Sequence, residues 1–450
     1  MIATPLMINA LTTDLYQLTM AAGYWRAGLT EPATFELFVR RLPPRRAFLI
    51  AAGLDDALAF LESIRFTEEE RNWLRALTQF AHVPSGFFDD YLRQFSFTGA
   101  VSAVSEGTPI FQDEPILRVT APLPEAQLVE TALLATVAFA TSVASKAARV
   151  VHAAAGRPVI EFGARRAHGV HAGLAAARAA FIGGCDGTSL VDAAYRYGIP
   201  TSGTMAHSWV QTFADEVDAF REFSRTFPES AVYLLDTYDT VAATDKLIAS
   251  GLKPPMVRLD SGEIVSLSRE VRAKLDAAGL QATRIFATGD LDEYRIGTIV
   301  KEGAPIDGFG VGTALSTVSD APALSAVYKL VEVHRHGESA GVIKRSPGKH
   351  TWPCPKQVWR VMENGSPVSD LIAGVGEAPP PNAVPLLQPA MEHGRRLTPT
   401  PPLAEIRESS RRAVAALPER LLSLDAAADY PVAISAPLDA ARVTASRYDR

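Results

Sequence analysis

The middle of the chain repeats one pattern of apolar and polar positions. Between about Pro158 and Thr313, a short apolar run ends in small, polar or acidic residues seven times. The runs and their followers are PVIEF then GARRAHG, AFIGG then CDGTS, IPTSG then TMAHS, VYLLD then TYDT, MVRLD then SGE, RIFATG then D, and IDGFG then VGT. Alanine-rich or amphipathic segments long enough for helices separate most of them. Apolar runs of this length suit strands buried on both faces, so the pattern predicts βα units around a parallel sheet.

Reactive side chains gather where these predicted strands end. Eight βα units close into a barrel whose active site lies at the carboxyl ends of its strands, and AVYKLVEV, after Ser325, could supply the eighth strand. So many reactive residue types at equivalent places indicate one site rather than scattered surface polarity. The residues at these ends are Arg165, Arg166, Asp186, His207, Asp236, Arg258, Asp260, Asp290 and Thr313.

The flanking segments show a mixed α and β pattern. A helix is predicted from Asn9 to Leu29, with Thr12 or Thr13 as its N-cap. The other elements expected before the barrel are a strand at 34–39, helices at 67–79 and 85–95, strands within 99–119 and a long helix at 128–154. After the barrel, GVIKRS and KQVWRVM resemble antiparallel strands, 377–402 contains eight prolines and is expected to be an ordered surface loop or linker, and 403–417 is expected to be a helix that stops before Pro418.

Composition narrows the class of protein. The chain has 450 residues, 47% hydrophobic and 21% charged, which is an ordinary globular balance. A net charge of −6 argues against a nucleic-acid binder, and two cysteines cannot form a disulfide framework, which fits a reducing cytoplasm. The N-terminus lacks a signal-peptide pattern, and the uncharged stretch between Glu130 and Lys146 falls short of the ~20 residues of a membrane helix.

His207 is the first candidate for chemistry. GTMAHSWV follows a strand-like run and precedes an amphipathic segment, which places His207 near a helix N-terminus on the active face. Helix N-termini favour anions and disfavour a protonated imidazole. A neutral imidazole there could act as a base or a nucleophile, and a structural histidine that hydrogen-bonds a loop is the alternative.

Three arginines mark anion recognition. Arg165 and Arg166 directly follow a buried strand, and positive charge at a helix start is unfavourable unless something anionic compensates it. Arg258, inside VRLD, should point into the barrel mouth or pair with an acid such as Asp236 or Asp290. Both readings of Arg258 could hold together.

The glycine-rich run GFGVGT, residues 308–313, follows the seventh strand. In barrels, the loops after strands seven and eight often hold a phosphate with backbone N–H groups, although such runs also serve as plain turns. The chain has no GxxxxGK[ST] loop, no early GxGxxG and no zinc spacing of His and Cys. The acids at the strand ends could hold Mg²⁺ through water, but they need not all be ligands.

Several of these segments together resemble the nicotinate phosphoribosyltransferase family. The similar pieces are LTTDLYQLTMAAGY, EFGARRAHG, SGTMAHSWV, VRLDSGE, IDGFGVGT, SAVYKLVEV and KRSPGKHTWPCPKQVWR, in family order from residue 11 to about 361. The resemblance implies an irregular or partial TIM-like α/β barrel of the type II phosphoribosyltransferases, with a second α+β domain built from both chain ends. The expected domains are 1–127, completed by 336–450, and the barrel at 128–335.

The resemblance also implies an activity. The family joins nicotinate to phosphoribosyl pyrophosphate (PRPP), giving nicotinate mononucleotide and diphosphate, and hydrolyses ATP as co-substrate through a phosphorylated histidine. That histidine would be His207, Mg²⁺ would accompany PRPP and ATP, and no side chain is assigned as a direct metal ligand. The expected partner is a second copy in a homodimer in the cytoplasm, with Tyr16 reaching the neighbour's site, and neither nucleic acid nor membrane is expected. The substrate-binding residues implied are Tyr16, Phe162, Arg165, Arg166, Thr204, Arg258, Asp260, Gly289, Gly310, Gly312 and Thr313.

Two alternatives and one departure stand beside this expectation. A related enzyme could use nicotinamide or quinolinate, although nicotinamide lacks the carboxylate that suits Arg258 and quinolinate would demand extra basic groups. A catalytically silent homologue that binds metabolites of NAD synthesis is the alternative from another class; intact His207, Arg258 and Thr313 argue against it. The departure is Cys354 in PCPK, where the family pattern has glycine, and it puts the local turn in doubt.

Overall fold

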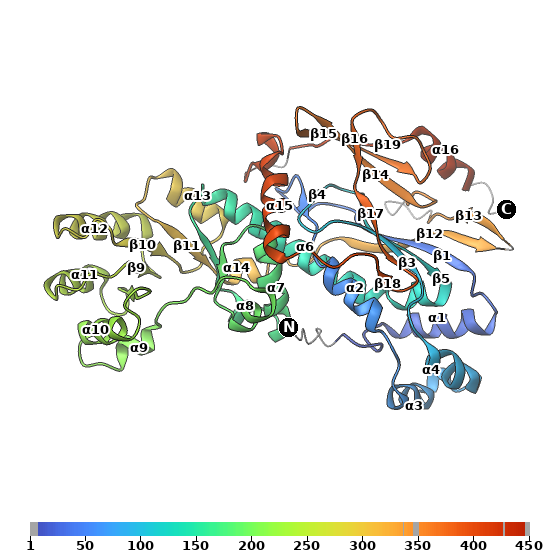
Figure 1. The fold of residues 1–450 in the computed structure, drawn as a ribbon, viewed down its shortest axis with the longest axis horizontal. Helices are drawn as coiled ribbons and strands as arrows, with labels where there is room; N and C mark the ends of the chain where they lie inside the picture. Colours follow the sequence, from blue (N-terminus) through green and yellow to red (C-terminus); the bar gives the residue numbers. More distant parts are fainter. Residues whose placement is uncertain (1–7, 336, 345–350, 426–427, 446–450) are drawn as a thin grey trace. The chain divides into compact units, whose positions relative to one another are not determined.

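The computed structural model describes residues 8–335, 337–344, 351–425 and 428–445. The chain forms two compact units, the first made of residues 1–142 and 323–450 and the second of residues 143–322 (Figure 1). Each unit has its own principal sheet. The candidate site described below lies entirely in the second unit.

The second unit alternates short strands with helices, as the repeated pattern predicts. Its strands are β6 (Val159–Glu161), β7 (Gly187–Thr188), β8 (Val232–Leu234), β9 (Met256–Leu259), β10 (Arg284–Ala287) and β11 (Gly308–Val311). Its helices are η3 (Ala164–Arg166), α7 (Val170–Ile182), α8 (Val191–Tyr197), α9 (His207–Gln211), α10 (Glu216–Thr226), α11 (Thr240–Ala249), α12 (Ile264–Ala277), α13 (Glu293–Lys301) and α14 (Thr313–Ser316).

The strands form a barrel with one open seam. Their order is β7-β6-β11-β10-β9-β8, all neighbours are parallel, and Thr201 adds a single parallel bridge to Thr188 at the edge of β7. Pairing of β6 with β11 closes the circle on one side. Within the described residues no ladder joins the Thr201 segment to β8. The expected partial α/β barrel is therefore confirmed, and its seam lies between the segment before His207 and the strand before Asp236.

Two predicted strands are wrong. IPTSG, residues 199–203, forms no strand and contributes only the bridge of Thr201 to Thr188. AFIGG, residues 180–184, is the end of helix α7 and the turn after it, because the alanine-rich segment before it continues as helix through Ile182. Gly183 ends this helix against α6, where an added Cβ would lie 2.3 Å from the carbonyl oxygen of Ala144. The strand of this unit is the shorter Gly187–Thr188, which follows the turn.

Helix α6 (Glu130–Ala153) is long and apolar enough to cross a membrane by length and composition alone. In the fold, however, 67% of its most apolar window is buried, as in the core helix of a folded protein. Its second half carries a buried ion network, in which Lys146 lies 2.5 Å from Glu293 and 2.8 Å from Asp320, and Arg149 lies 2.9 Å from Glu293. These pairs hold α6 to the start of α13 within the second unit.

The first unit is built mainly on antiparallel strands. A seven-stranded sheet has the order β13-β12-β1-β5-β3-β17-β18, a four-stranded sheet the order β16-β14-β15-β19, and β2 pairs with β4. The strands are β1 (Pro32–Val39), β2 (Leu49–Ile50), β3 (Ala100–Val104), β4 (Pro109–Ile110), β5 (Pro115–Pro122), β12 (Ala326–Arg335), β13 (Glu338–Gly341), β14 (Lys356–Glu363), β15 (Ser366–Gly374), β16 (Ala383–Pro385), β17 (Leu387–Glu392), β18 (Arg395–Arg396) and β19 (Val432–Ile434). The helices are α1 (Leu15–Arg26), α2 (Leu54–Ser63), α3 (Glu68–Ala76), η1 (Thr78–Phe80), η2 (Phe87–Tyr91), α4 (Leu92–Gln94), α5 (Leu123–Leu128), α15 (Leu403–Ala415), η4 (Glu419–Leu422) and α16 (Ala436–Ala445).

Three sequence predictions are corrected in this unit. AVYKLVEV is not an eighth barrel strand: it forms β12, which pairs antiparallel with β1, because its alternating apolar side chains fit a sheet that is buried on one face. The proline-rich segment 377–402 is not a loop throughout, since β17 within it pairs with β3. Helix α1 begins at Leu15 and is capped by Asp14 rather than by Thr12 or Thr13, with the Gln17 side chain accepting the Asp14 N–H at 3.3 Å.

The backbone conformation at Cys354 explains why the family pattern has glycine at this position. Its φ is +64°, in the left-handed region that glycine enters without steric cost. The Cys354 N–H donates to the carbonyl oxygen of Val331 at 2.9 Å, so the turn before β14 is hydrogen-bonded with a cysteine in a strained backbone conformation. Of the KRSPGKHTWPCPKQVWR segment, residues 345–350 lie outside the described residues.

Candidate active site

A cavity of about 630 Å³ opens at the carboxyl ends of the barrel strands. Its walls come from the segments that follow β6 and β7, from the segment after Thr201, and from β9. Parallel barrel strands bring their carboxyl ends together at one face, so residues far apart in the sequence meet here. The lining residues are Phe162, Ala164, Arg165, Val170, Gly173, Ser189, Leu190, Gly203, Thr204, Met205, Ala206, His207, Arg258 and Asp260.

His207 lies across the open seam of the barrel. It is the first residue of α9, as its position before an amphipathic segment predicts, and its side chain is 41% exposed. Its Nδ1 lies 3.1 Å from the hydroxyl of Thr237, which follows β8, and its Nε2 lies 3.7 Å from Oδ2 of Asp260, which follows β9. The imidazole is thus oriented from two sides and still reaches the cavity.

Arg258 is the centre of the polar network on the cavity wall. It leaves β9 with its side chain only 11% exposed. Its Nη2 pairs with Asp260 at 2.8 Å, its Nη1 donates to Thr204 at 2.5 Å and its Nε donates to Thr288 at 2.9 Å. The acid partner is therefore Asp260, and neither Asp236 nor Asp290 as the sequence suggested. A guanidinium has five N–H donors, so these contacts leave donor capacity for a ligand.

Asp260 is held as a carboxylate. Burial raises the pKa of Asp260. Hydrogen bonds from Arg258 and Thr288, together with the charges of Arg258 and His207, lower the pKa by more than burial raises it, so the pKa lies below the usual value. Thr288 donates to the same carboxylate oxygen that Arg258 contacts. An ionised Asp260 beside Nε2 of His207 favours the imidazole tautomer that carries its proton on Nε2, which leaves the lone pair on Nδ1.

Asp236 offers an unsatisfied oxygen beside this network. Its Oδ2 accepts from the Ser261 hydroxyl at 2.5 Å, whereas its Oδ1 is buried and has no hydrogen-bond partner among the described residues. Three possible metal-ligand atoms, one each from His207, Asp236 and Asp260, lie within 4.8 Å of one another. Two carboxylates suit a hard cation such as Mg²⁺, while an imidazole does not, so the donor set fits a cation bound mainly by Asp236 and by oxygens of a substrate.

The other arginines and Phe162 occupy the β6 side. Phe162 and Arg165 line the cavity, and the Phe162 ring lies 6.1 Å from that of Phe286. Arg165 and Arg166 are exposed in the 3-10 turn η3, and Arg166 is not part of the lining. Of the two arginines, Arg165 alone faces this cavity.

Four further predicted residues lie at strand ends outside the cavity lining. Thr313 is exposed at the start of α14, directly after β11. Gly289 has a φ of +89°, and a Cβ there would lie 1.7 Å from the carbonyl oxygen of Asp260. Gly310 is packed so closely that a Cβ would lie 2.6 Å from Thr288, while Gly312 precedes α14 as its N-cap. These glycines have a packing role in the fold whether or not they bind phosphate.

Tyr16 belongs to the first unit. It lies on α1 with a side chain 48% exposed, and its hydroxyl donates to Glu130 at 3.0 Å and accepts from Gln17 at 3.1 Å. Burial raises the pKa of Tyr16. The two hydrogen bonds orient the Tyr16 hydroxyl, and about half of the side chain remains at the surface.

Sequence reasoning missed two residues that organise the cavity. Thr288 joins Arg258 to Asp260, and Thr237 holds His207. Thr288 lies near the end of the predicted run RIFATG, and Thr237 begins the TYDT that follows VYLLD. Their position was a usable signal, but threonine is common in loops and does not by itself indicate a site.

Comparisons with known proteins agree over most of the chain. The family models described as the N-terminal domain of nicotinate phosphoribosyltransferase, the nicotinate phosphoribosyltransferase family and its C-terminal domain match residues 11–138, 158–353 and 378–441. Nicotinate phosphoribosyltransferase pncB2 of Mycobacterium tuberculosis is 46% identical over 439 residues, covering 95% of this chain and 92% of the relative. The Bacillus subtilis nicotinate phosphoribosyltransferase is 43% identical over 370 residues, covering 79% and 74%. The crystal structure of human nicotinic acid phosphoribosyltransferase superposes with a TM-score of 0.83 at 29% identity, covering 96% of this chain and 99% of that one.

Proposed function

Because the chain belongs to the nicotinate phosphoribosyltransferase family, we propose that it joins nicotinate to PRPP, the first step of NAD synthesis by nicotinate salvage, with coupling to ATP through a phosphorylated His207. The observation that carries this proposal is the network of Thr204, Arg258 and Asp260 beside His207 on one cavity wall. The network combines a guanidinium that can bind an anionic group with an imidazole that is held in one orientation.

The transfer step needs no strong base from the protein. The pyridine nitrogen of nicotinate attacks C1 of the ribose, the bond from C1 to the diphosphate oxygen breaks, and diphosphate leaves with that electron pair. Arg258 would hold the nicotinate carboxylate or a phosphate, Thr204 would position the same group, and Phe162 would contact the ring. Arg165 and the N–H groups near Gly289, Gly310, Gly312 and Thr313, with Arg166 at the rim, would bind phosphate.

His207 serves the ATP half of the proposal. With the proton on Nε2 facing Asp260, the Nδ1 lone pair attacks the γ-phosphorus, and ADP leaves with the bridging oxygen. Thr237 would release its contact with Nδ1 at that step. Water later cleaves the N–P bond, so phosphate leaves and the imidazole is restored.

Mg²⁺ is the proposed metal partner of PRPP and ATP. The buried, unpartnered Oδ1 of Asp236 would help to hold it, and the ion would neutralise the diphosphate leaving group when bound. Arg258 and Thr288 already occupy one oxygen of Asp260, so Asp260 is proposed to position His207 and Arg258 rather than to serve as the main metal ligand.

The activity test compares three acceptor bases. We expect PRPP with nicotinate to give mononucleotide and diphosphate, faster with ATP and Mg²⁺ than without, because Arg258 matches a carboxylate. Nicotinamide should be poor because it lacks that charge, and quinolinate should be poor because its second carboxylate meets only Arg165 and Arg258 as permanent cations in the lining. Preference for nicotinamide or quinolinate would replace the proposed substrate, and PRPP binding without turnover of any base would support the silent homologue.

We further propose that the enzyme is a homodimer in the cytoplasm, with Tyr16 of one subunit at the cavity of the other. Large apolar side chains are exposed on α1, where Tyr16 and Met20 lie one turn apart. In the barrel unit, Val170 in the cavity lining is 84% exposed and Tyr195 on α8 is 76% exposed. Apolar surface of this kind is typical of protein interfaces. Cytoplasmic location rests on the two unbridged cysteines, and cell fractionation tests it.

A complementation experiment tests the shared site. Tyr16→Ala and Arg258→Ala should each lose nicotinate turnover, and a mixture of the two chains after subunit exchange should recover activity, because a mixed dimer contains one intact site. Tyr16→Phe, which keeps the ring and loses only the hydroxyl's hydrogen bonds with Glu130 and Gln17, is the matched control and should retain most activity. Mixtures without recovery, while sedimentation shows mixed dimers, would place Tyr16 in its own subunit's structure instead.

A further inference from the structure

The proposed reaction gives no role to Glu161, the first residue of the EFGARRAHG segment. Glu161 is the last residue of β6, and its side chain is 0% exposed. The residues that follow it, among them Phe162 and Arg165, line the barrel cavity, whereas Glu161 itself is not part of the lining. A carboxylate is costly to bury, so this position requires compensating contacts that an apolar side chain would not need.

Both carboxylate oxygens of Glu161 accept hydrogen bonds from neighbouring strand ends. Oε1 accepts the N–H of Gly163, in the turn after β6, and Oε2 accepts the hydroxyl of Thr188, at the end of β7, at 2.7 Å. Burial raises the pKa of Glu161, and these hydrogen bonds offset part of that rise. No basic side chain among the described residues pairs with this carboxylate, so its contacts are those that join the two strand ends.

Thr188 extends the contact to further segments of the cavity wall. Its hydroxyl, which donates to Glu161, also accepts the N–H of Leu190 at 3.0 Å, and its carbonyl oxygen accepts the N–H of Ser202 at 3.0 Å. Leu190 lines the cavity, and Ser202 directly precedes the lining segment 203–207. One buried chain of hydrogen bonds therefore joins three of the segments that form the wall.

The backbone ladder ends where these side-chain contacts begin. Strands β6 and β7 pair in parallel, and the pair of Glu161 with Thr188 is the last in their register. One backbone hydrogen bond follows it, from the N–H of Ser189 to the carbonyl oxygen of Glu161 at 3.0 Å. Beyond this point the amides of Gly163 and Leu190 are held by the side chains of Glu161 and Thr188. A strand as short as β7 thus depends on side chains to fix the turns above it.

We propose that Glu161 is a positioning residue for the transfer reaction, which holds segments 162–165 and 189–190 at the separation that the substrates require. This role rests on the proposed function, and Glu161 acts through the two segments without touching a substrate. An apolar side chain could fill the same space, but it would leave the Gly163 N–H and the Thr188 hydroxyl without their acceptor. Segment 162–165 supplies the proposed ring contact and a phosphate-binding arginine, so binding of both substrates should weaken when the contact is lost.

The test combines kinetics, binding and amide exchange on the full-length protein. Glu161→Gln keeps the size of the side chain, but its single carbonyl oxygen cannot replace both carboxylate oxygens. KM for nicotinate and for PRPP should rise at least about tenfold, the factor for one hydrogen bond to a charged group, with a smaller change in kcat because ground-state binding is affected. Isothermal titration with PRPP and Mg²⁺ should show the same loss of affinity without turnover. Hydrogen–deuterium exchange should become faster at segments 162–166 and 189–191.

Variants of Thr188 keep the test decisive if Glu161→Gln fails to fold. Thr188→Val removes the hydroxyl and keeps the shape, so it should reproduce the rise in KM and the faster exchange. Thr188→Ser keeps the hydroxyl and should leave KM near that of the unchanged enzyme. The double variant of Glu161→Gln and Thr188→Val should raise KM by less than the product of the two single effects, because both act through one contact.

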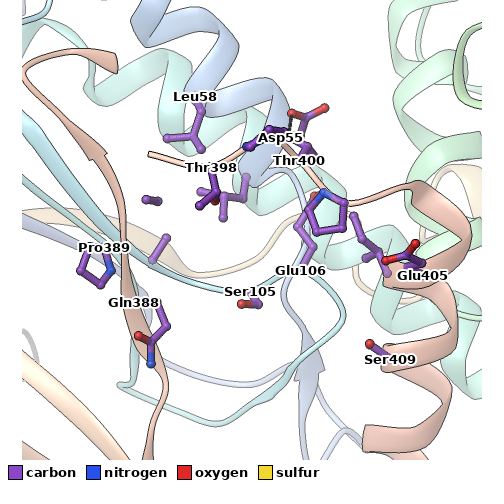
Figure 2. A pocket seen from close by; sticks show the side chains of 16 residues that line it. Asp55, Leu58, Ser105, Glu106, Gln388, Pro389, Thr398, Thr400, Glu405 and Ser409 are labelled. Carbon is purple, nitrogen blue, oxygen red and sulfur yellow. Dashed lines mark hydrogen bonds between the residues drawn. The ribbon is translucent and has the colours of Figure 1, made fainter. Parts of the chain in front are cut away.

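Glu106 is the matched control, because it is also a buried glutamate that accepts a glycine N–H beside a cavity. It lies in the first unit with 9% exposure and accepts the N–H of Gly53 at 2.7 Å. Figure 2 shows it at the border of a cavity of about 390 Å³ that the proposed reaction does not use. Glu106→Gln should therefore lower the thermal midpoint without raising KM for either substrate.

Three results would overturn the positioning role of Glu161. They are unchanged KM in both Glu161→Gln and Thr188→Val, a rise in KM that Glu106→Gln shares, and faster exchange at the two segments with unaltered affinity for PRPP. The last result would show that the contact serves the fold and not the substrates. Absence of nicotinate turnover in the unchanged enzyme would contradict the proposed function alone, because PRPP titration and amide exchange still decide whether Glu161 positions the two segments.

Discussion

Replacing His207 with alanine should abolish formation of a phosphoenzyme from ATP and remove the stimulation of mononucleotide synthesis by ATP. The reason is geometric: His207 is the imidazole that lines the barrel cavity, with Nδ1 near Thr237 and Nε2 near the ionised Asp260. The ATP-independent rate should survive, because the pyridine nitrogen is already a nucleophile. Incubation with γ-labelled ATP, followed by quenching at alkaline pH and by acid treatment, measures the acid-labile phosphate directly.

The control for this result is His168→Ala. His168 is exposed in the same barrel face and lies outside the cavity lining, so the variant should keep both the phosphoenzyme and the ATP stimulation. Thr237→Val should form an amount of phosphoenzyme between those of His207→Ala and His168→Ala, since it removes the hydroxyl that orients Nδ1 of His207 and leaves the imidazole itself. Acid-labile phosphate that persists in His207→Ala at the level of the unchanged enzyme would show that another residue carries the phosphoryl group.

The sequence predicted the fold class of the barrel unit, but not every strand in it. VRLD, VYLLD and RIFATG are strands as expected, because apolar side chains on both faces leave little alternative to a buried parallel strand. AFIGG failed because apolar residues at the end of an alanine-rich helix have the same composition as a strand, and periodicity cannot separate the two. AVYKLVEV was a real strand placed in the wrong sheet, since its partner, β1, lies nearly three hundred residues away in the sequence.

Side-chain pairing was the part that the sequence left open. The position of Arg258 inside a strand indicated an acid partner, but Asp236, Asp260 and Asp290 all follow strands, and only the structure selects Asp260. Two residues further along the same strand return to the same face of a sheet, which is the physical reason for that selection. The position of a residue at a strand end was also not enough to place it in the cavity. Thr313 and Arg166 both lie at the carboxyl end of the barrel, but outside the cavity lining.

Replacing Arg258 with lysine should weaken binding of nicotinate or PRPP by about 1.5–3 kcal/mol, the range for a hydrogen bond to a charged group. Lysine keeps the positive charge, but it cannot reach Thr204, Asp260 and Thr288 at once, as the three guanidinium nitrogens do. Loss of the Arg258 contacts also removes part of what keeps the pKa of Asp260 low, so the orientation of His207 should weaken with it. Steady-state kinetics should therefore show a raised KM together with weaker ATP coupling.

Arg272→Lys separates this effect from a general loss of stability. The guanidinium of Arg272, on α12, also donates three hydrogen bonds: to the carbonyl oxygens of Thr283 at 2.6 Å and Leu280 at 2.8 Å, and to the carboxylate of Asp276 at 2.8 Å. It lies outside the cavity lining, so its variant should lower the thermal midpoint without changing the KM for nicotinate or PRPP. If Arg258→Lys behaves in the same way, with a lower midpoint and unchanged kinetics for both substrates, then Arg258 holds the barrel mouth together and another group must recognise the nicotinate carboxylate.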